Sequence, residues 1–421
     1  MRTIIYKFGA LAGALYIANA MAHIPFPLDQ LALNAPVPVN LWDPNGTLLL
    51  RKGEVILDER HRGRLQMHLP VVDEEEYRAW TYRYTTALDR MVRNNQRLEA
   101  IAGVERPMGV DTVAAPSEAS AVEVWPDLHD TLATLLHQGA SAHDFMDRLA
   151  AIERRIVAIT RSRVDDSLFV LVQLLQDVRV GYSATHALLC AVLLRLVAPQ
   201  CGLDEAQTVA AQRAALTMNI GMSHLHDALA RQAAPLTPAQ RDQIRAHPGV
   251  GMDWLQQLGV SDGAWLTAVR DHHETPTGAG YPAGRRDVGT LAQLLRLADT
   301  YVARLGPRVH RPGLPSPHAA REAYLGPDGQ PSALGAAFVK ALGAYIPGSH
   351  VRLVNGEMGV VVRRGRRSHT PLVMALVGRR GLPLGEPALR DTSEAALEVQ
   401  RGLGAHEVKV RVPASRLLAR L

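Results

Sequence analysis

The stretch "RDHHETPTGAGYPAG", residues Arg270–Gly284, places two histidines side by side and follows them with a glutamate and a glycine-punctuated turn. Neighbouring residues on a helix point about 100° apart, so His272 and His273 can share one partner only across a helix end. A metal ion is one common reason to gather imidazoles. Taken alone, the stretch is more typical of an exposed loop with two solvated histidines, because short motifs often arise by chance.

The composition is that of an ordinary globular protein with more than one domain. The chain has 421 residues, of which 47% are apolar and 21% are charged, and this length exceeds what one small core needs. The net charge of +5 and the isoelectric point near 9.3 are too mildly basic for a dedicated nucleic-acid binder, so nucleic acid is not an expected partner. The two cysteines form no disulfide or zinc-finger pattern, which fits a reducing compartment and predicts a cytoplasmic protein.

The N-terminal third divides into three expected segments. Residues 1–22 are basic and moderately apolar, which is typical of a leader or of an upstream-extended start, and no transmembrane anchor is expected because the apolar part is too short. Residues 23–103 are expected to form a small β-containing unit, with a hairpin turn at 44–46 and an amphipathic helix over 74–103. Residues 104–122 are predicted to be a linker.

The rest of the chain is expected to be helical and then β-rich, so the predicted fold class is mainly α. Nearly all residues of "HALLCAVLLRLVA", 186–198, are apolar, which predicts a buried core helix within a helical domain over 123–346. Residues 347–421 alternate in hydropathy around the turn Asn355–Gly356 and predict a small β-rich domain. A helical domain is thus expected between two small β-containing units.

Polar residues in apolar helical surroundings indicate a site within the helical domain. Asp299 stands inside "LLRLADTYV", where a buried carboxylate needs a partner because an unpaired buried charge is costly. His186 and His247 lie in similar surroundings, far along the chain from His272 and His273. Four histidines and one aspartate in one helical domain are typical of a site that several helices build together.

Residues from about 170 to 315 resemble the HD-GYP family, a branch of the HD metal-dependent phosphohydrolases. The carrying motif is His272-His273-Glu274 followed by Gly278, Gly280, Tyr281 and Pro282, which matches the family signature His-His-Glu and then Gly-x-Gly-Tyr-Pro. The resemblance implies an all-helical fold, two or three metal ions and hydrolysis of cyclic di-GMP. The implied metal ligands are His186, His247, His272, His273 and Asp299. The implied ligand-binding residues are Gly278, Gly280, Tyr281, Pro282, Arg308 and Arg311.

The chain departs from the family at its first signature, His-Asp followed by Ile-Gly-Lys. Met218, Asn219 and Met222 stand in place of the histidine, the aspartate and the lysine. Methionine is a weak ligand for hard cations, and a neutral amide cannot bridge two ions as a carboxylate does. We therefore expect at most one divalent ion, such as Fe or Mn, with a metal-free site as the alternative, and no residue is assigned as catalytic.

Two further histidines follow the altered signature. His224 and His226, in "MSHLHDAL", are expected on the surface rather than as replacement ligands. Tyr182 stands where some three-metal members of the family carry a glutamate.

Three functions remain open from the sequence. The first is a degenerate, weakly active or inactive module that acts as a receptor for cyclic di-GMP or a related dinucleotide, or as an interaction domain for protein partners in signalling. The second is an active metal-dependent phosphodiesterase that hydrolyses cyclic di-GMP to linear pGpG or GMP. The third is an adaptor, or a nucleic-acid contact, through the C-terminal arginines Arg363, Arg364, Arg366 and Arg367, although few aromatic residues accompany them.

Overall fold

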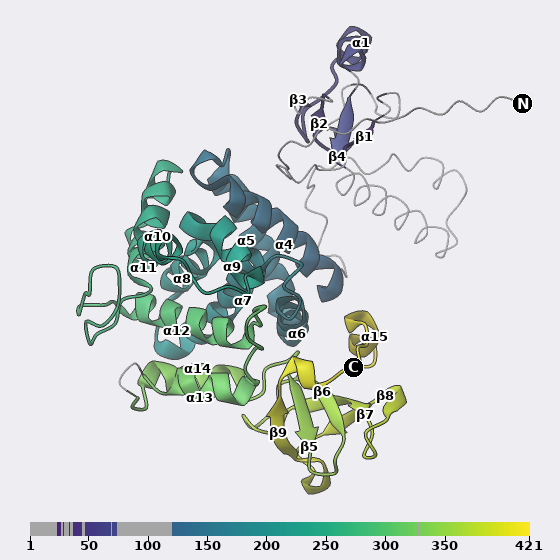
Figure 1. Ribbon diagram of the computed structural model, residues 1–421, viewed down its shortest axis with the longest axis vertical. Coiled ribbons are helices and arrows are strands. Elements are labelled where there is room, and N and C mark those ends of the chain that lie inside the picture. The colour runs from purple at the N-terminus through teal and green to yellow at the C-terminus, as the bar shows by residue number, and fades with distance from the viewer. Residues whose placement is uncertain are drawn as a thin grey trace, which may run out of the picture. The chain divides into compact units, whose positions relative to one another are not determined.

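The computed structural model describes residues 23–26, 28, 33, 37–43, 47–68, 70–73, 120–326 and 329–421. The chain divides into two compact units, Met1–Ser117 and Glu118–Leu421. Helices dominate the second unit (Figure 1), and the predicted mainly α fold class is confirmed.

The first unit holds a small antiparallel sheet with strand order β1-β4-β2-β3. Its elements are β1 (His23–Pro25), β2 (Leu41–Trp42), β3 (Leu48–Leu50), α1 (Glu59–Met67) and β4 (Val71–Asp73). Leu41 pairs with Leu50, so the expected hairpin forms. The turn at 44–46, the expected leader at 1–22, the expected helix at 74–103 and residues 104–119 of the expected linker lie outside the described residues.

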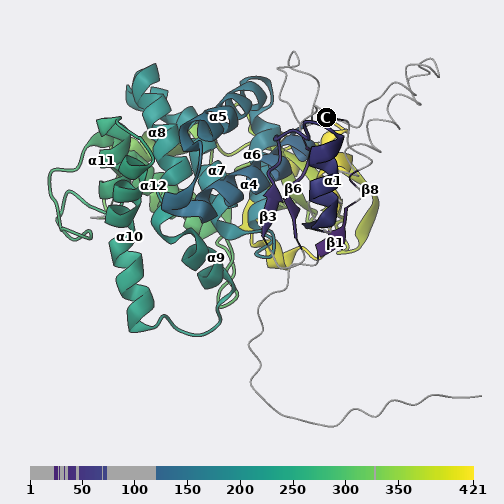
Figure 2. The same ribbon diagram turned by 90° about the horizontal axis from the view of Figure 1, so that it is seen from above.

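The helical part of the second unit surrounds one buried helix. Its α-helices are α4 (Ala121–Gln138), α5 (Phe145–Ser162), α6 (Val164–Leu175), α7 (Tyr182–Val197), α8 (Glu205–Thr217), α9 (Ser223–Arg231), α10 (Pro238–Gln257), α11 (Gly263–Asp271), α12 (Thr290–Leu305), α13 (Ser316–Tyr324) and α14 (Ala333–Leu342). Helix α7 lies in their midst (Figure 2) and packs against α4, α6, α8, α9, α12 and α14. Its "HALLCAVLL" segment is buried on every side, as an all-round apolar helix should be.

Local signals in the sequence set several helix ends. Thr237 caps the N-terminus of α10 by accepting from the Gln240 backbone, and Pro238 follows at the first helical position. Helix α12 ends at Leu305, and its buried residues recur at helical spacing. The segment Tyr182–Cys201 is long and apolar enough to cross a membrane, but 72% of it is buried within the protein, so it serves as a core helix.

A five-stranded antiparallel sheet closes the chain, with strand order β8-β7-β6-β5-β9. The strands are β5 (His350–Leu353), β6 (Met358–Arg363), β7 (Leu372–Val377), β8 (Pro383–Asp391) and β9 (Val399–Leu403), and α15 (Ala414–Leu418) follows them. The hairpin expected at Asn355–Gly356 joins β5 to β6. Gly356 adopts a positive φ of 90° there, which favours glycine.

The sheet and the helices share one core. Val360 and Val362 on β6 join the main cluster of buried apolar residues, whereas Val361 between them faces a smaller cluster on the other side, as alternation along a strand requires. The arginines at the end of β6 also bind the helical part. Arg363 pairs with Asp166, and Arg364 pairs with Asp165 at 2.5 Å. Two of the four C-terminal arginines therefore attach the sheet to α6. The boundary expected between 346 and 347 stays a prediction.

Candidate functional site

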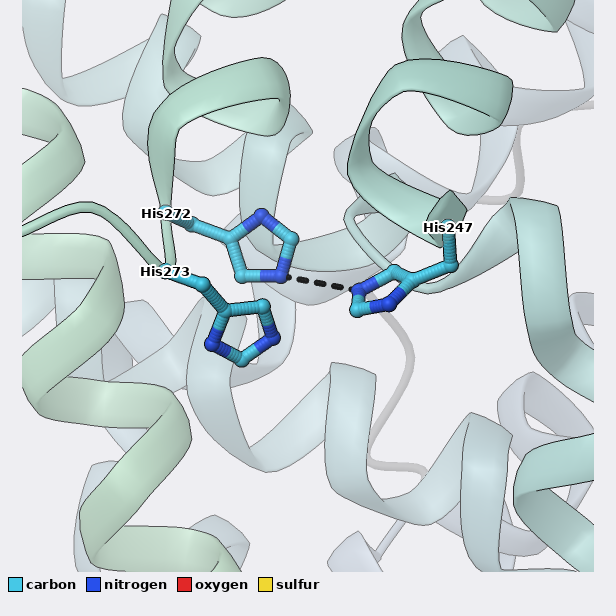
Figure 3. Close-up of side chains that lie close together, drawn as sticks. All are labelled: His247, His272 and His273. Carbon is cyan, nitrogen blue, oxygen red and sulfur yellow. Dashed lines mark hydrogen bonds between the residues drawn. The ribbon is translucent and has the colours of Figure 1, made fainter. Parts of the chain in front are cut away.

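Three of the predicted ligands meet at one point (Figure 3). His247 projects from α10, whereas His272 and His273 follow the last turn of α11. The Nε2 atoms of His247 and His272 lie 3.2 Å apart, and one nitrogen from each of the three rings lies within 4.8 Å of the others. His247 and His272 are fully buried. Among the described residues, this is the one group of three or more His, Cys, Asp or Glu side chains close enough to share a metal ion.

Hydrogen bonds fix the protonation of two of these rings. Nδ1 of His247 donates to the Ile244 carbonyl at 2.6 Å, and Nδ1 of His272 donates to the Val269 carbonyl at 2.6 Å. Since a carbonyl only accepts, each Nδ1 carries the proton, and each neutral ring keeps a lone pair on Nε2. The two lone pairs therefore face each other at 3.2 Å, which is repulsive unless a cation lies between them.

The ring pKa values disfavour a proton as that cation. Burial, together with the neighbouring His272, lowers the pKa of His247 to about 3. Burial also lowers the pKa of His272 and holds that of His273 well below its usual value. A proton is thus a poor occupant at neutral pH. Two nitrogens bound to one metal ion lie about 3.0–3.4 Å apart, since each bond is about 2.1 Å long, so the residues present fit a divalent metal.

The remaining two predicted ligands form a separate pair. His186 on α7 donates from Nε2 to Asp299 Oδ1 on α12 at 2.9 Å. Burial alone would raise the pKa of Asp299, but the hydrogen bond and charge of His186 hold it below the usual value. Nδ1 of His186 is buried without a hydrogen-bond partner among the described residues.

The altered signature leaves an unsatisfied polar side chain in the core. Met218 ends α8 and is fully buried. Asn219 is 3% exposed, and neither its amide oxygen nor its amide nitrogen has a partner among the residues that the structure describes. Such an orphan is costly. Met222 follows one turn later and is partly exposed. The chain thus keeps the polar character of the position without its carboxylate or its imidazole.

His226 corrects an expectation. We expected His224 and His226 on the surface, and His224 is indeed exposed, whereas His226 is only 5% exposed. Its ring centroid lies 5.3 Å from that of His186 and 4.8 Å from that of Tyr182, and burial lowers its pKa well below the usual value. The chain does not leave the site after Met222, because α9 turns one face towards α7.

A signal for His226 was present in the sequence. Ser223, His226, Leu229 and Ala230 recur at helical spacing, and these are the buried residues of α9. His224 lies off this face, where it stacks on His137 with centroids 4.2 Å apart. The apolar period would have separated the two histidines.

Hydrogen bonds to the buried Glu274 side chain hold the glycine-rich turn after His273 closed. The buried Glu274 carboxylate accepts hydrogen bonds from the backbone amides of Ala283 at 2.7 Å and Arg285 at 2.9 Å. The Tyr281 ring stacks on His273 with centroids 4.4 Å apart and an interplanar angle of 21°. The turn therefore fixes the least buried of the three histidines.

Gly278 and Gly280 in the turn are glycines for different structural reasons. Gly278 adopts a φ of 78°, which favours glycine. A Cβ on Gly280 would lie 2.5 Å from the Glu274 Cα and 2.5 Å from the His273 carbonyl oxygen, so only glycine allows the two sides of the turn to meet. Pro282 follows Tyr281 and lies on the exposed side of the turn.

The two predicted ligand-binding arginines have different surroundings. Arg308 lies over the Tyr182 ring, with its guanidinium carbon 5.4 Å from the centroid, and its Nε is buried without a partner among the described residues. Arg311 donates to the Ala303 carbonyl at 2.6 Å and to the Gly306 carbonyl at 3.3 Å. Arg311 thus caps the last turn of α12, a structural role that the sequence did not indicate.

A cavity of about 350 Å³ opens beside both groups of predicted ligands. His273 and Asp299 both line it, together with Tyr281, Arg296, Arg304 and Arg311. The volume lies within the range of small-molecule sites. The cationic wall favours an anionic occupant close to the three histidines.

The chain is similar to known proteins in this region. Residues 169–322 match the model of the HD domain family. The chain is 28% identical over 248 residues to the cyclic di-GMP phosphodiesterase PA4108 of Pseudomonas aeruginosa, covering 57% of this chain and 56% of that protein. It is 26% identical over 144 residues to the 3'3'-cGAMP-specific phosphodiesterase 3 of Vibrio cholerae, covering 33% of this chain and 30% of that protein. The chain thus spans about half and about a third of these two relatives.

One solved structure is also similar. Bd1817, an HDG"Y"P protein from Bdellovibrio bacteriovorus, aligns over 76% of this chain and 98% of that chain, with 16% identity and a TM-score of 0.43. The family match shows an HD domain over residues 169–322, and the resemblance to the HD-GYP branch stated from the sequence is confirmed.

Proposed function

We propose that this HD domain is a degenerate HD-GYP module that binds a cyclic dinucleotide, cyclic di-GMP or a close relative, and that hydrolyses it weakly or not at all. It holds at most one divalent metal ion, on His247, His272 and His273. In this reading the module is a cytoplasmic receptor or interaction domain that passes the presence of the nucleotide to protein partners in signalling.

The observation that carries the proposal is the state of the altered signature. Hydrolysis by a metal pair needs two ions about 3.5–4 Å apart, held by a bridging group, to activate water and stabilise the leaving oxygen. Asn219 stands at the bridging position with a neutral amide, and Met218 offers only a thioether. His186 and Asp299, which would hold the second ion, bond to each other instead at 2.9 Å. Among the described residues, the three-histidine cluster is the one close set of candidate metal ligands.

The choice of ligand rests on the cavity and on the relatives. The cavity beside His273 carries cationic side chains and has room for part of a nucleotide. The two curated relatives are named as phosphodiesterases of cyclic di-GMP and of 3'3'-cGAMP. A cyclic dinucleotide carries two phosphodiester anions, which suit such a wall.

The test is a metal count combined with binding and turnover of cyclic di-GMP by the purified full chain. We expect one ion or fewer per chain, heat on titration with cyclic di-GMP, and no linear product after prolonged incubation with Mn²⁺ or Fe²⁺. Two bound ions together with steady formation of pGpG or GMP would instead establish the second reading, an active phosphodiesterase with altered ligands.

A converse experiment tests the cause of the inactivity. The triple substitution Met218→His, Asn219→Asp and Met222→Lys restores the imidazole, the bridging carboxylate and the ammonium together, because such groups act as a unit. We expect a second ion to bind and metal-dependent hydrolysis to rise at least about 100-fold over the wild type. The double variant Met218→His with Met222→Lys lacks the bridge and serves as the matched control.

The adaptor reading through the C-terminal arginines has weaker support. Arg363 and Arg364 are engaged with Asp166 and Asp165 of α6, which leaves Arg366 and Arg367 exposed. Two exposed arginines are a small electrostatic footprint for nucleic acid. A salt-dependent shift of a DNA or RNA probe by the full chain, abolished in the variant Arg366→Gln/Arg367→Gln, would favour this third reading.

A further inference from the structure

The cavity beside the histidine cluster has three arginines in its wall, and only one of them is free. Arg304 is paired with Glu322 at 2.7 Å. The Arg311 guanidinium donates hydrogen bonds to the carbonyls of Ala303 and Gly306. Arg296, on α12, makes no hydrogen bond or ion pair with any residue in the described parts of the chain.

The position of Arg296 is unusual for an unpaired cation. The side chain is only partly exposed, and burial lowers its pKa below the usual value. A guanidinium removed from water without a partner is destabilising unless an anion completes its hydrogen bonds. No atom of Arg296 is sealed off from the cavity in the way that Nε of Arg308 is sealed, so its donors remain accessible to a ligand.

The charges around Arg296 also favour an anion. Asp299 is one helical turn away, but its Oδ1 accepts from His186, and the structure shows no ion pair between Asp299 and Arg296. Tyr281, which also lines the cavity, lies under the Arg245 guanidinium, whose carbon is 5.7 Å from the ring centroid. The cavity wall near Arg296 is therefore positive, and it would become more so with a metal ion on the three histidines.

We propose that Arg296 is a phosphate-binding residue, which holds one phosphodiester group of the ligand in the cavity and orients it towards His273 and Asp299. A planar guanidinium donates two parallel hydrogen bonds to phosphate oxygens, which gives direction as well as attraction. This inference rests on the proposed function, because that function supplies the phosphodiester ligand. It assigns the main contact with the anion to Arg296, rather than to Arg308, whose Nε is buried, or to Arg311, which caps α12.

The experiment is calorimetric titration of the full chain with cyclic di-GMP, with inorganic phosphate as a competitor. Arg296→Ala is expected to weaken affinity about 10- to 100-fold, the loss of one charge-assisted bidentate contact. Arg296→Lys is expected to restore only part of it, because an ammonium is a point charge without a fork. The matched control Arg401→Ala removes an arginine that is paired with Glu407 and does not line the cavity, and its affinity is expected to stay within about threefold. Phosphate is expected to compete in the wild type and not in Arg296→Ala.

The outcomes separate this inference from the proposed function. Tight binding of cyclic di-GMP by both the wild type and Arg296→Ala would overturn the role of Arg296 and leave the receptor function standing. Binding of pGpG or phosphate that depends on Arg296, without binding of cyclic di-GMP, would support the inference and overturn the ligand proposed above. Absence of all three from the wild type would overturn both. Circular dichroism of each variant, unchanged from the wild type, supports reading a loss as a loss of contact.

Discussion

At the scale of single residues, the main feature is a pair of neutral imidazoles whose lone pairs face each other. His247 and His272 each donate a hydrogen bond from Nδ1–H to a backbone carbonyl. Both Nε2 atoms are therefore unprotonated, and they lie 3.2 Å apart. Carbonyl bonds of this kind fix the tautomer and the ring orientation of metal-binding histidines. The two rings are therefore preorganised to bind a cation.

This predicts the effect of removing one ring. His272→Ala should reduce bound metal from about one ion per chain to less than about 0.1, because the two remaining ligands hold a divalent ion weakly. A chelator should lower the melting temperature of the wild type and leave that of His272→Ala unchanged, since only the wild type gains stability from the bound ion. Elemental analysis and thermal melts measure the two effects.

The matched control for this prediction is His224→Ala. His224 is exposed and stacks on His137 outside the cluster, so its removal should leave the metal content unchanged. Equal metal content in His272→Ala and His224→Ala would contradict the assignment of the cluster.

At the scale of elements, the turn after α11 acts as a rigid support for His273. Glu274 ties the two ends of the turn through the amides of Ala283 and Arg285. Gly280 allows the second half of the turn to lie directly against the backbone of its first half. The family motif is therefore a mechanical requirement of the turn as well as a signature.

Gly280→Ala should disrupt this support. The new Cβ would lie 2.5 Å from both the Glu274 Cα and the His273 carbonyl oxygen, and these are backbone atoms that cannot rotate away. We expect a loss of about 1–3 kcal/mol in the free energy of unfolding, as for other overpacked sites, and a metal content below half that of the wild type. Gly289→Ala is the control, because nothing lies within 4 Å of its Cβ and its φ of −61° suits alanine.

Strand β5 carries a pH-dependent contribution to stability that lies outside the site. Burial lowers the pKa of His350 to about 4, with a smaller contribution from Arg411, whereas the unfolded chain has the ordinary value near 6.5. Between these pH values the unfolded chain binds a proton that the folded chain does not. The stability from a neutral His350 is therefore complete above about pH 6.5 and is lost as the pH falls towards 4.

Comparison of the wild type with His350→Gln isolates this contribution. The difference in their free energies of unfolding should shift by about 1–3 kcal/mol against the wild type between pH 7 and pH 4.5. Denaturant titrations at the two pH values measure the shift. A difference that stays constant with pH would show that His350 has the same pKa in the folded protein as in the unfolded chain.

At the scale of the whole molecule, the helices and the C-terminal sheet are one packing unit. Val360, Val362 and Met374 of the sheet belong to the same buried cluster as Phe169 and Leu171 of α6. Gly348, just before β5, lies against the Phe169 carbonyl, where a Cβ would approach to 2.8 Å. The core of the helical part therefore continues beyond residue 346.

Truncation tests this dependence. The fragment 118–421 should unfold in one cooperative transition, because it retains a complete compact unit. The fragment 118–346 should aggregate or lose its cooperative transition, because each apolar side chain uncovered costs about 1.5–3 kcal/mol against a total stability of about 5–15 kcal/mol. Equal melting curves for the two fragments would show that the helical part is independent.

The sequence alone predicted the mainly α fold class, the buried helix α7 and the candidate ligands. The nearly all-apolar stretch 186–198 located α7, and the histidine-glycine motif indicated the family. These features are local, since each is set by residues a few positions apart. The altered positions Met218 and Asn219 could also be found in the sequence, because they stand where the family has its first signature.

Only the tertiary structure decided which side chains share a partner. It separated the five expected ligands into a cluster of three and a hydrogen-bonded pair, and it brought His226 beside His186. It also bound Arg311 to the end of α12 and left Arg296 without a partner in the part of the chain that the structure describes. These outcomes depend on distances between helices that are far apart in the chain and on which donors are already satisfied. Such distances come from the packing of the whole core, which no short segment of sequence specifies.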